Sequence, residues 1–108
     1  MAPGLMVHNP LSYLVDAPLF IVPRVLDRLR AYRAHCPMRE LEPLADTLLA
    51  EIEAHPTKFW VMRQFQTTLE RVAGEDAAMR DRVGSELEKL MDVLGIESSD
   101  GVLGNNRR

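Results

Sequence analysis

Large apolar residues recur every three or four positions in four stretches of the chain, which is the spacing of one side of a helix. The stretches span residues 23–34, residues 57–73, residues 75–94 and a segment that starts near Met38 or Pro43 and ends at Ala54. No stretch alternates apolar and polar residues over the length of a strand, and no segment repeats another. The pattern therefore predicts an all-α chain with four helices.

The helix predicted over residues 57–73 has the clearest start and stop signals. The Thr57 hydroxyl can accept a hydrogen bond from a free amide of the first turn, and Gly74 stands where a left-handed residue often closes a helix. Gly95 takes the same place after the fourth stretch, where we expect Ile96 to fold back onto Met91. The apolar side of the helix over residues 57–73 consists of Val61, Met62, Phe65, Thr68, Leu69 and Val72.

The N-terminal half is divided into short pieces, because all seven prolines lie in the first 56 residues. The dipeptide Asn9-Pro10 predicts the start of a short helical turn. Residues 16–18 could restart a helix. Pro23 then either kinks that helix or opens a new one at its own position.

The four apolar stripes predict one domain, because no helix of this length is stable alone and each must bury its apolar side against the others. Residues 24–39 hold five arginines and one aspartate, a net +4, whereas residues 40–55 hold five carboxylates and no Lys or Arg, a net −5. These opposite charges favour pairing of the first two helices. We predict an antiparallel four-helix bundle, or an irregular variant, with an extra short helical turn near Pro10.

The predicted boundaries are a flexible arm over residues 1–9, a helical domain over residues 10–96 and a tail over residues 97–108. The tail contains Val102 and Leu103 and is less polar than a typical disordered segment, so it is a candidate to dock onto the helices.

Composition limits the class of protein. The chain has 108 residues, 46% of them apolar, and a net charge of −3, so it can bury a core and has no excess of positive charge for nucleic acid. It contains no apolar run near 18 residues and no secretory leader pattern, and its single cysteine, Cys36, cannot form an internal disulfide. We expect a cytoplasmic protein that does not contact membranes.

The residues capable of catalysis or metal binding do not form a known arrangement. Neither His35 nor His55 follows a carboxylate at Glu-x-x-His spacing, and Cys36 beside His35 points in a different direction on a helix. Ser85 lacks the flanking glycines of a nucleophile elbow, and no glycine-rich phosphate loop is present. We therefore expect no enzyme activity, no cofactor, no metal and no small-molecule substrate.

DNA binding is the alternative hypothesis. The polar side of the helix over residues 57–73 carries side chains that can contact phosphates and bases: Lys58, Arg63, Gln64, Thr67 and Arg71. In a helix-turn-helix protein, the preceding helix crosses the DNA backbone. Here that helix has a charge of −5 and would be repelled, so we disfavour nucleic acid as a partner.

Trp60 is the main candidate for a binding surface. At helical spacing it projects away from the apolar stripe, so either another part of the chain or a partner must cover its indole. Phe59 lies at the edge of the stripe and Arg63 lies one turn away, and Trp and Arg are frequent in the energetic centre of protein interfaces. We predict a non-catalytic interaction module that binds another protein or itself through Trp60, Phe59 and Arg63.

Overall fold

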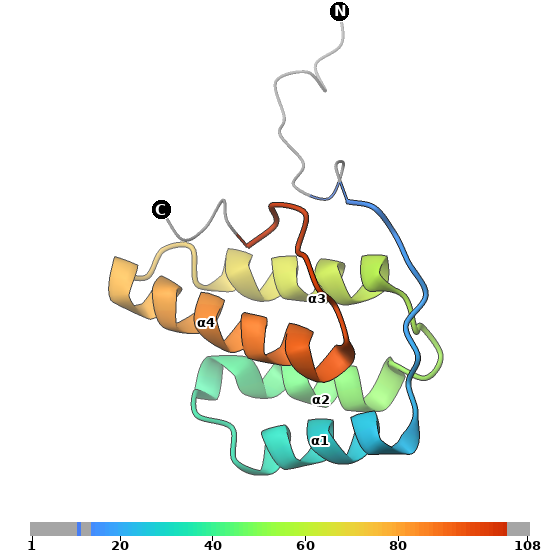
Figure 1. Cartoon of the computed structure of the whole chain (residues 1–108). Helices are drawn as coiled ribbons and strands as arrows, with labels where there is room; N and C mark the ends of the chain where they lie inside the picture. The colour runs from blue at the N-terminus through green and yellow to red at the C-terminus, as the bar shows by residue number, and fades with distance from the viewer. Residues whose placement is uncertain (1–10, 12–13, 104–108) are drawn as a thin grey trace, which may run out of the picture.

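The computed structural model describes residue 11 and residues 14–103, and it is built from helices (Figure 1). Within these residues there is no strand, only one isolated β-bridge between Pro18 and Thr57. The predicted all-α class is thus confirmed. The helices are α1 (Pro23–Ala34), the 3₁₀-helix η3 (Arg39–Leu41), α2 (Glu42–Glu51), α3 (Lys58–Arg71) and α4 (Ala77–Leu94).

Three of the predicted helix ends are confirmed. The Thr57 hydroxyl accepts a hydrogen bond from the Trp60 amide at 3.2 Å, and Asp76 caps α4 in the same way. Gly95 is left-handed with φ 76°, and the Ile96 amide donates to the Met91 carbonyl at 2.9 Å, as in a Schellman cap. These ends depend on side chains and backbone within a few residues, so local sequence determines them.

The predicted cap at Gly74 is wrong, because α3 ends three residues earlier at Arg71. Its last turn tightens, with the amides of Val72 and Ala73 donating to carbonyls three residues before them. Such bonds satisfy the free carbonyls without a left-handed residue. Gly74 lies in the following turn, which the Glu75 amide closes on the Val72 carbonyl at 3.0 Å.

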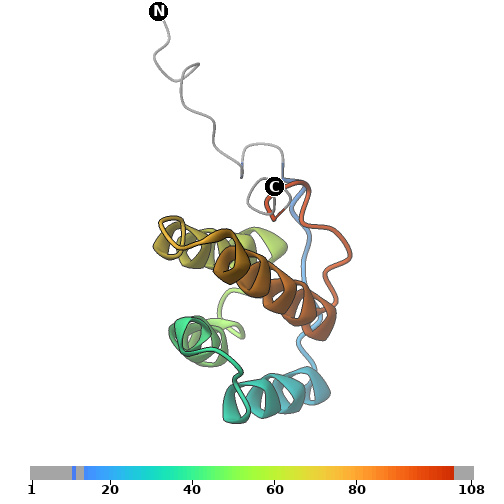
Figure 2. The ribbon, with the colours of Figure 1, turned by 90° about the vertical axis from the view of Figure 1, so that its left-hand side faces the viewer.

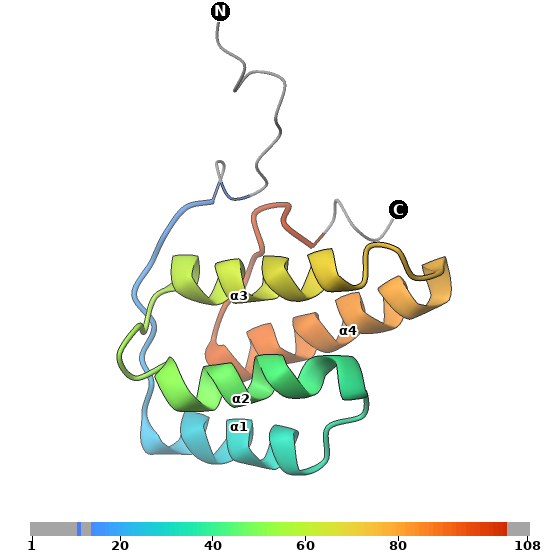
Figure 3. The ribbon, with the colours of Figure 1, turned by 180° about the vertical axis from the view of Figure 1, so that it is seen from behind.

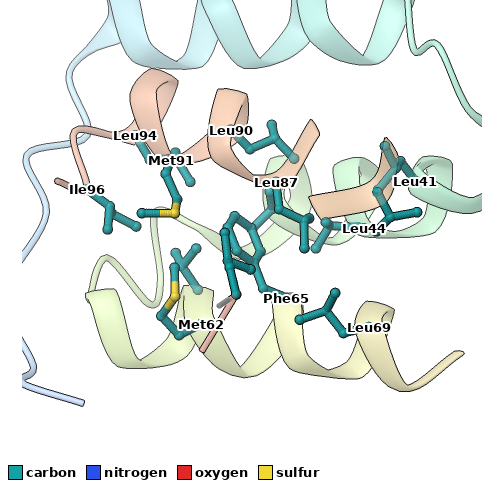
Figure 4. Close-up of a cluster of buried hydrophobic side chains, with 14 of the residues drawn as sticks. Leu41, Leu44, Met62, Phe65, Leu69, Leu87, Leu90, Met91, Leu94 and Ile96 are labelled. Atoms are coloured by element: carbon teal, nitrogen blue, oxygen red, sulfur yellow. The ribbon is translucent and has the colours of Figure 1, made fainter. Parts of the chain in front are cut away.

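The core lies where the apolar sides of the helices meet, and the six residues predicted for the α3 stripe are all buried. Phe65 is the largest fully buried side chain and lies in the middle of the cluster between α3 and α4 (Figure 4). In the described chain α1 contacts α2 and α4, and α3 also contacts α2 and α4. Each of the four α-helices therefore packs against at least two others.

Chain direction reverses from each helix to the next (Figures 1 and 3). The charge argument for the first two helices is supported, because Arg33 of α1 pairs with Asp46 of α2 at 2.7 Å and approaches Glu42 at 3.9 Å. These pairs are partly exposed, so they favour a register more than they add stability.

Residues 14–22, which we call the strap, form an extended segment, so the predicted helical restart at residues 16–18 is wrong. The Leu19 amide donates to the Pro56 carbonyl at 2.7 Å, and the Lys58 amide donates to the Ala17 carbonyl at 2.8 Å. Pro18 and Pro23 lack amide hydrogens and push the residues before them into extended conformations, which prevents a helix here. Pro23 instead opens α1 at its own position. The turn predicted after Pro10 is described only in part, and there the Leu14 amide donates to the Leu11 carbonyl at 3.2 Å, as in one helical turn.

Residues 96–103 run from the end of α4 past α3 to the same side of the molecule as the strap (Figures 1 and 2). Ile96, Val102 and Leu103 are buried in this segment and join the core. Asp100 has a left-handed φ of 52° and forms hydrogen bonds with the strap and with α3. The segment is thus packed against the helices up to residue 103.

Candidate interaction surface

Phe59, Trp60, Arg63 and the neighbouring His55 gather at the start of α3, and we call them the aromatic corner. Trp60 is half-buried against the core, and its ring stacks on His55 with centroids 5.4 Å apart and planes 17° apart. The sequence predicted that another part of the chain or a partner covers the indole, without identifying the segment. The imidazole of His55, which precedes α3 in the chain, was not anticipated in that role.

Phe59 and Arg63 occupy the outer part of the aromatic corner. Phe59 is 37% exposed, and the guanidinium carbon of the exposed Arg63 lies 5.9 Å from the centre of its ring. This distance suits a cation–π contact, which keeps the Phe59 ring in place while one side of it faces water. The three residues predicted from sequence therefore lie together on the first two turns of α3.

The strap adds exposed apolar side chains that the sequence prediction missed. Phe20 is 84% exposed, Val15 70% and Val22 50%, whereas Leu19 and Ile21 are partly buried against the core. Alternate residues of an extended chain point to opposite sides, which explains why Phe20 and Val22 are exposed while Leu19 and Ile21 are partly buried. The signal in the sequence was the short uncharged apolar run between Pro18 and Pro23, a segment too short for a helix.

Two aspartates fix the strap to the start of α3. Asp16 Oδ1 accepts a hydrogen bond from the Phe59 amide at 2.8 Å, and so supplements Thr57 at the start of α3. Asp100 Oδ2 accepts from Lys58 Nζ at 2.7 Å and from the Val15 amide at 2.9 Å. The Lys58 ammonium, together with the Val15 amide, lowers the pKa of Asp100. One carboxylate thus joins the strap, α3 and the segment after α4.

The polar side of α3 is largely occupied by contacts within the chain. The Lys58 side chain is only 12% exposed because it pairs with Asp100. Gln64 donates to the Trp60 carbonyl at 3.2 Å, and the Thr67 hydroxyl donates to the Arg63 carbonyl at 3.1 Å. These contacts reduce the set of side chains that could reach nucleic acid, and DNA binding stays an untested alternative.

A polar cluster around the buried Glu86 connects α1 to α4. The Tyr32 hydroxyl donates to Glu86 Oε1 at 3.0 Å, and Lys89 Nζ approaches Glu86 Oε2 at 2.8 Å. Burial, followed by the hydrogen bond to Glu86, raises the pKa of Tyr32. In the described part of the chain no buried side-chain nitrogen or oxygen lacks a hydrogen-bond partner. Contacts within the protein therefore account for this cluster.

The remaining candidates for chemistry are dispersed. The Cys36 thiol donates to the Met38 carbonyl at 3.3 Å, while His35 is exposed at the end of α1. Among the described residues no three His, Cys, Asp or Glu side chains are grouped to hold a metal ion. A search of the same residues for a membrane-spanning helix finds none of sufficient length and apolar character.

Comparison with other proteins gives one result. No curated protein and no solved structure matches the chain. The profile of one protein family matches residues 34–107, which include α2, α3, α4 and the aromatic corner, while the strap and nearly all of α1 precede the match. Because the match covers more than half of the sequence, the chain belongs to the family described as a domain of unknown function, DUF4844.

Proposed function

We propose that this chain is a non-catalytic protein–protein interaction module of the cytoplasm, which binds another protein or a second copy of itself. Its contact surface consists of Phe59, Trp60 and Arg63 of the aromatic corner, extended by Phe20 and Val22 of the strap. The cytoplasmic placement is supported by the single cysteine, which suits a reducing compartment.

Phe20 is the observation that carries the proposal. This residue is 84% exposed although the chain has a well-formed core, and burying a phenylalanine stabilises a complex by roughly 1.5–3 kcal/mol. Phe59 and Val22 add apolar area, and Arg63 adds a cation held over an aromatic ring. Aromatic residues and arginine are enriched in the energetic centres of interfaces.

We also propose that the four helices form an irregular antiparallel bundle. The reversal of chain direction between consecutive helices and the contacts of each helix with at least two others support it. This arrangement holds the start of α3 rigid, which reduces the entropy lost when its side chains are covered by a partner.

Site-specific photo-crosslinking tests the proposed function. A benzoylphenylalanine placed at Phe59 should give one defined adduct in cells that naturally make the protein, and that adduct should disappear when Arg63→Ala is added. The same residue placed at Arg82, exposed on α4, is the matched control. An adduct of twice the chain mass identifies a second copy, and another single mass identifies a different partner. Equal labelling at the two positions, or no adduct at Phe59, refutes the proposed surface.

A further inference from the structure

One edge of the strap is occupied and the other is open. The Ala17 carbonyl and the Leu19 amide bond to the residues that begin α3. In an extended chain, consecutive residues direct their N–H and C=O groups to opposite edges. The Pro18 carbonyl, both backbone groups of Phe20 and the Val22 amide therefore face the outer edge, away from α3, whereas the Val22 carbonyl accepts from amides of α1.

The outer edge is accessible. Within the described residues the backbone of Phe20 takes part in no hydrogen bond, and the Val22 amide also has no protein partner. An open groove of about 330 Å³ is lined by Pro18, Leu19 and Phe20, and its other walls are the first turns of α1 and the last turn of α4. An extended edge with free amides and outward apolar side chains is a ready site for strand pairing.

We infer that the strap pairs in antiparallel register with the strap of a second copy of this chain, with the two Phe20 residues opposite each other. In this register each Phe20 amide donates to the other Phe20 carbonyl, and each Val22 amide donates to the Pro18 carbonyl of the second copy. Pro18 has no amide hydrogen, so it cannot donate a hydrogen bond to the Val22 carbonyl of the other copy. The Val22 carbonyl does not need one, because it already accepts from the Val25 and Leu26 amides of α1.

Charge complementarity favours a second copy over an unrelated segment. Residues 17–23 carry no charge, so two straps meet without repulsion. Asp16 and Arg24 stand at equal distances along the sequence on either side of Phe20. Arg24 lies in the first turn of α1, two residues beyond the extended segment, so in this register its long side chain would extend toward Asp16 of the other copy. Arg24 is exposed and makes no ion pair with the described residues of its own chain, so its guanidinium is available.

This inference rests on the proposed function only in treating the exposed apolar residues as an interface. It shares Phe20 and Val22 with the proposed surface and adds the edge, the register and the occupant, whereas the crosslink at Phe59 tests the aromatic corner. The two proposals can therefore fail separately.

Sedimentation velocity of the full chain from about 1 µM to about 1 mM, the range of weak protein association, tests the pairing. Val22→Pro removes the amide that donates across the dimer. Its own chain tolerates this change because Val22 has φ −84° and its amide bonds to none of the described residues. Arg24→Glu places like charges at both ends of the register, while an acidic residue suits the first turn of α1. Arg82→Glu on α4 repeats the charge change far from the strap.

We expect the wild-type chain and Arg82→Glu to dimerise alike, and Val22→Pro and Arg24→Glu to weaken dimerisation by about tenfold or more. Circular dichroism melts check that each variant is folded. If Val22→Pro does not fold, the result for Arg24→Glu alone tests the pairing. A wild-type chain that stays monomeric over the whole range, or a dimer that both variants leave unchanged, overturns the inference. A monomer that still forms a specific Phe59 adduct with another protein leaves the proposed function intact. A strap dimer without such an adduct supports the strap pairing and refutes the proposed surface around Phe59.

Discussion

Val102 and Val15 allow the same substitution to be compared in two environments. Val102 is 1% exposed in the segment after α4, whereas Val15 is 70% exposed on the strap. Changing valine to alanine removes two methyl groups, each worth about 0.8 kcal/mol when buried, and leaves a small cavity that adds to the loss. We expect Val102→Ala to lower the free energy of unfolding by about 1.5–3 kcal/mol. Val15→Ala should change it by less than about 0.5 kcal/mol.

Equilibrium unfolding in urea, followed by circular dichroism, measures both variants. For a domain of this size the slope is roughly 1–2 kcal/mol per molar urea, so the midpoint of Val102→Ala should fall by about 1 M or more. The midpoint of Val15→Ala should stay near that of the wild type. Equal effects of the two substitutions would show that residues 96–103 contribute little to the core, and the placement of this segment against the helices would then be wrong.

Three further substitutions test single contacts. Asp100→Asn should destabilise the protein above pH 5. Because the folded pKa of Asp100 is lowered, the wild type should lose this advantage as the pH falls below about 4, so urea midpoints of the two proteins should converge in acid. Tyr32→Phe removes a hydrogen bond to the buried Glu86 and should reduce stability by about 1.5–3 kcal/mol, and an unchanged melting temperature would argue against that contact. Thr57→Ala should cost about 1 kcal/mol through loss of the N-cap, whereas Thr67→Ala on the exposed side of α3 should cost less, and equal losses would contradict the capping assignment.

The regular parts of the fold could be predicted from sequence because the interactions that define them are local. The burial of Phe65 and its neighbours follows from spacing along one helix, and the caps at Thr57, Asp76 and Gly95 use groups within a few residues. Gly74 was misplaced for the converse reason. Two ways of closing α3 were available, and the tighter last turn ended the helix before the glycine was reached.

The candidate surface could be predicted only in part. Phe59, Trp60 and Arg63 share the start of one helix, so helical spacing alone places them together. The cover of Trp60 by His55 depends on the turn between α2 and α3, which no periodic pattern describes. Phe20 was missed altogether because its exposure depends on the course of the strap past α3.

The strap is where local sequence and tertiary structure disagree most, and the disagreement has a physical meaning. Its position is fixed by contacts with residues far along the chain, including a hydrogen bond between Val15 and Asp100 across a separation of 85 residues. An apolar segment held in this way would usually be buried on both sides, or its edge would carry a charge that discourages pairing. Between Pro18 and Pro23 the strap carries no charge, and its outer edge is blunted only at Pro18, which lacks an amide hydrogen. Places where a chain departs from such rules often serve a function. The open edge at Phe20 therefore supports contact with a second polypeptide more strongly than any single feature of the helices.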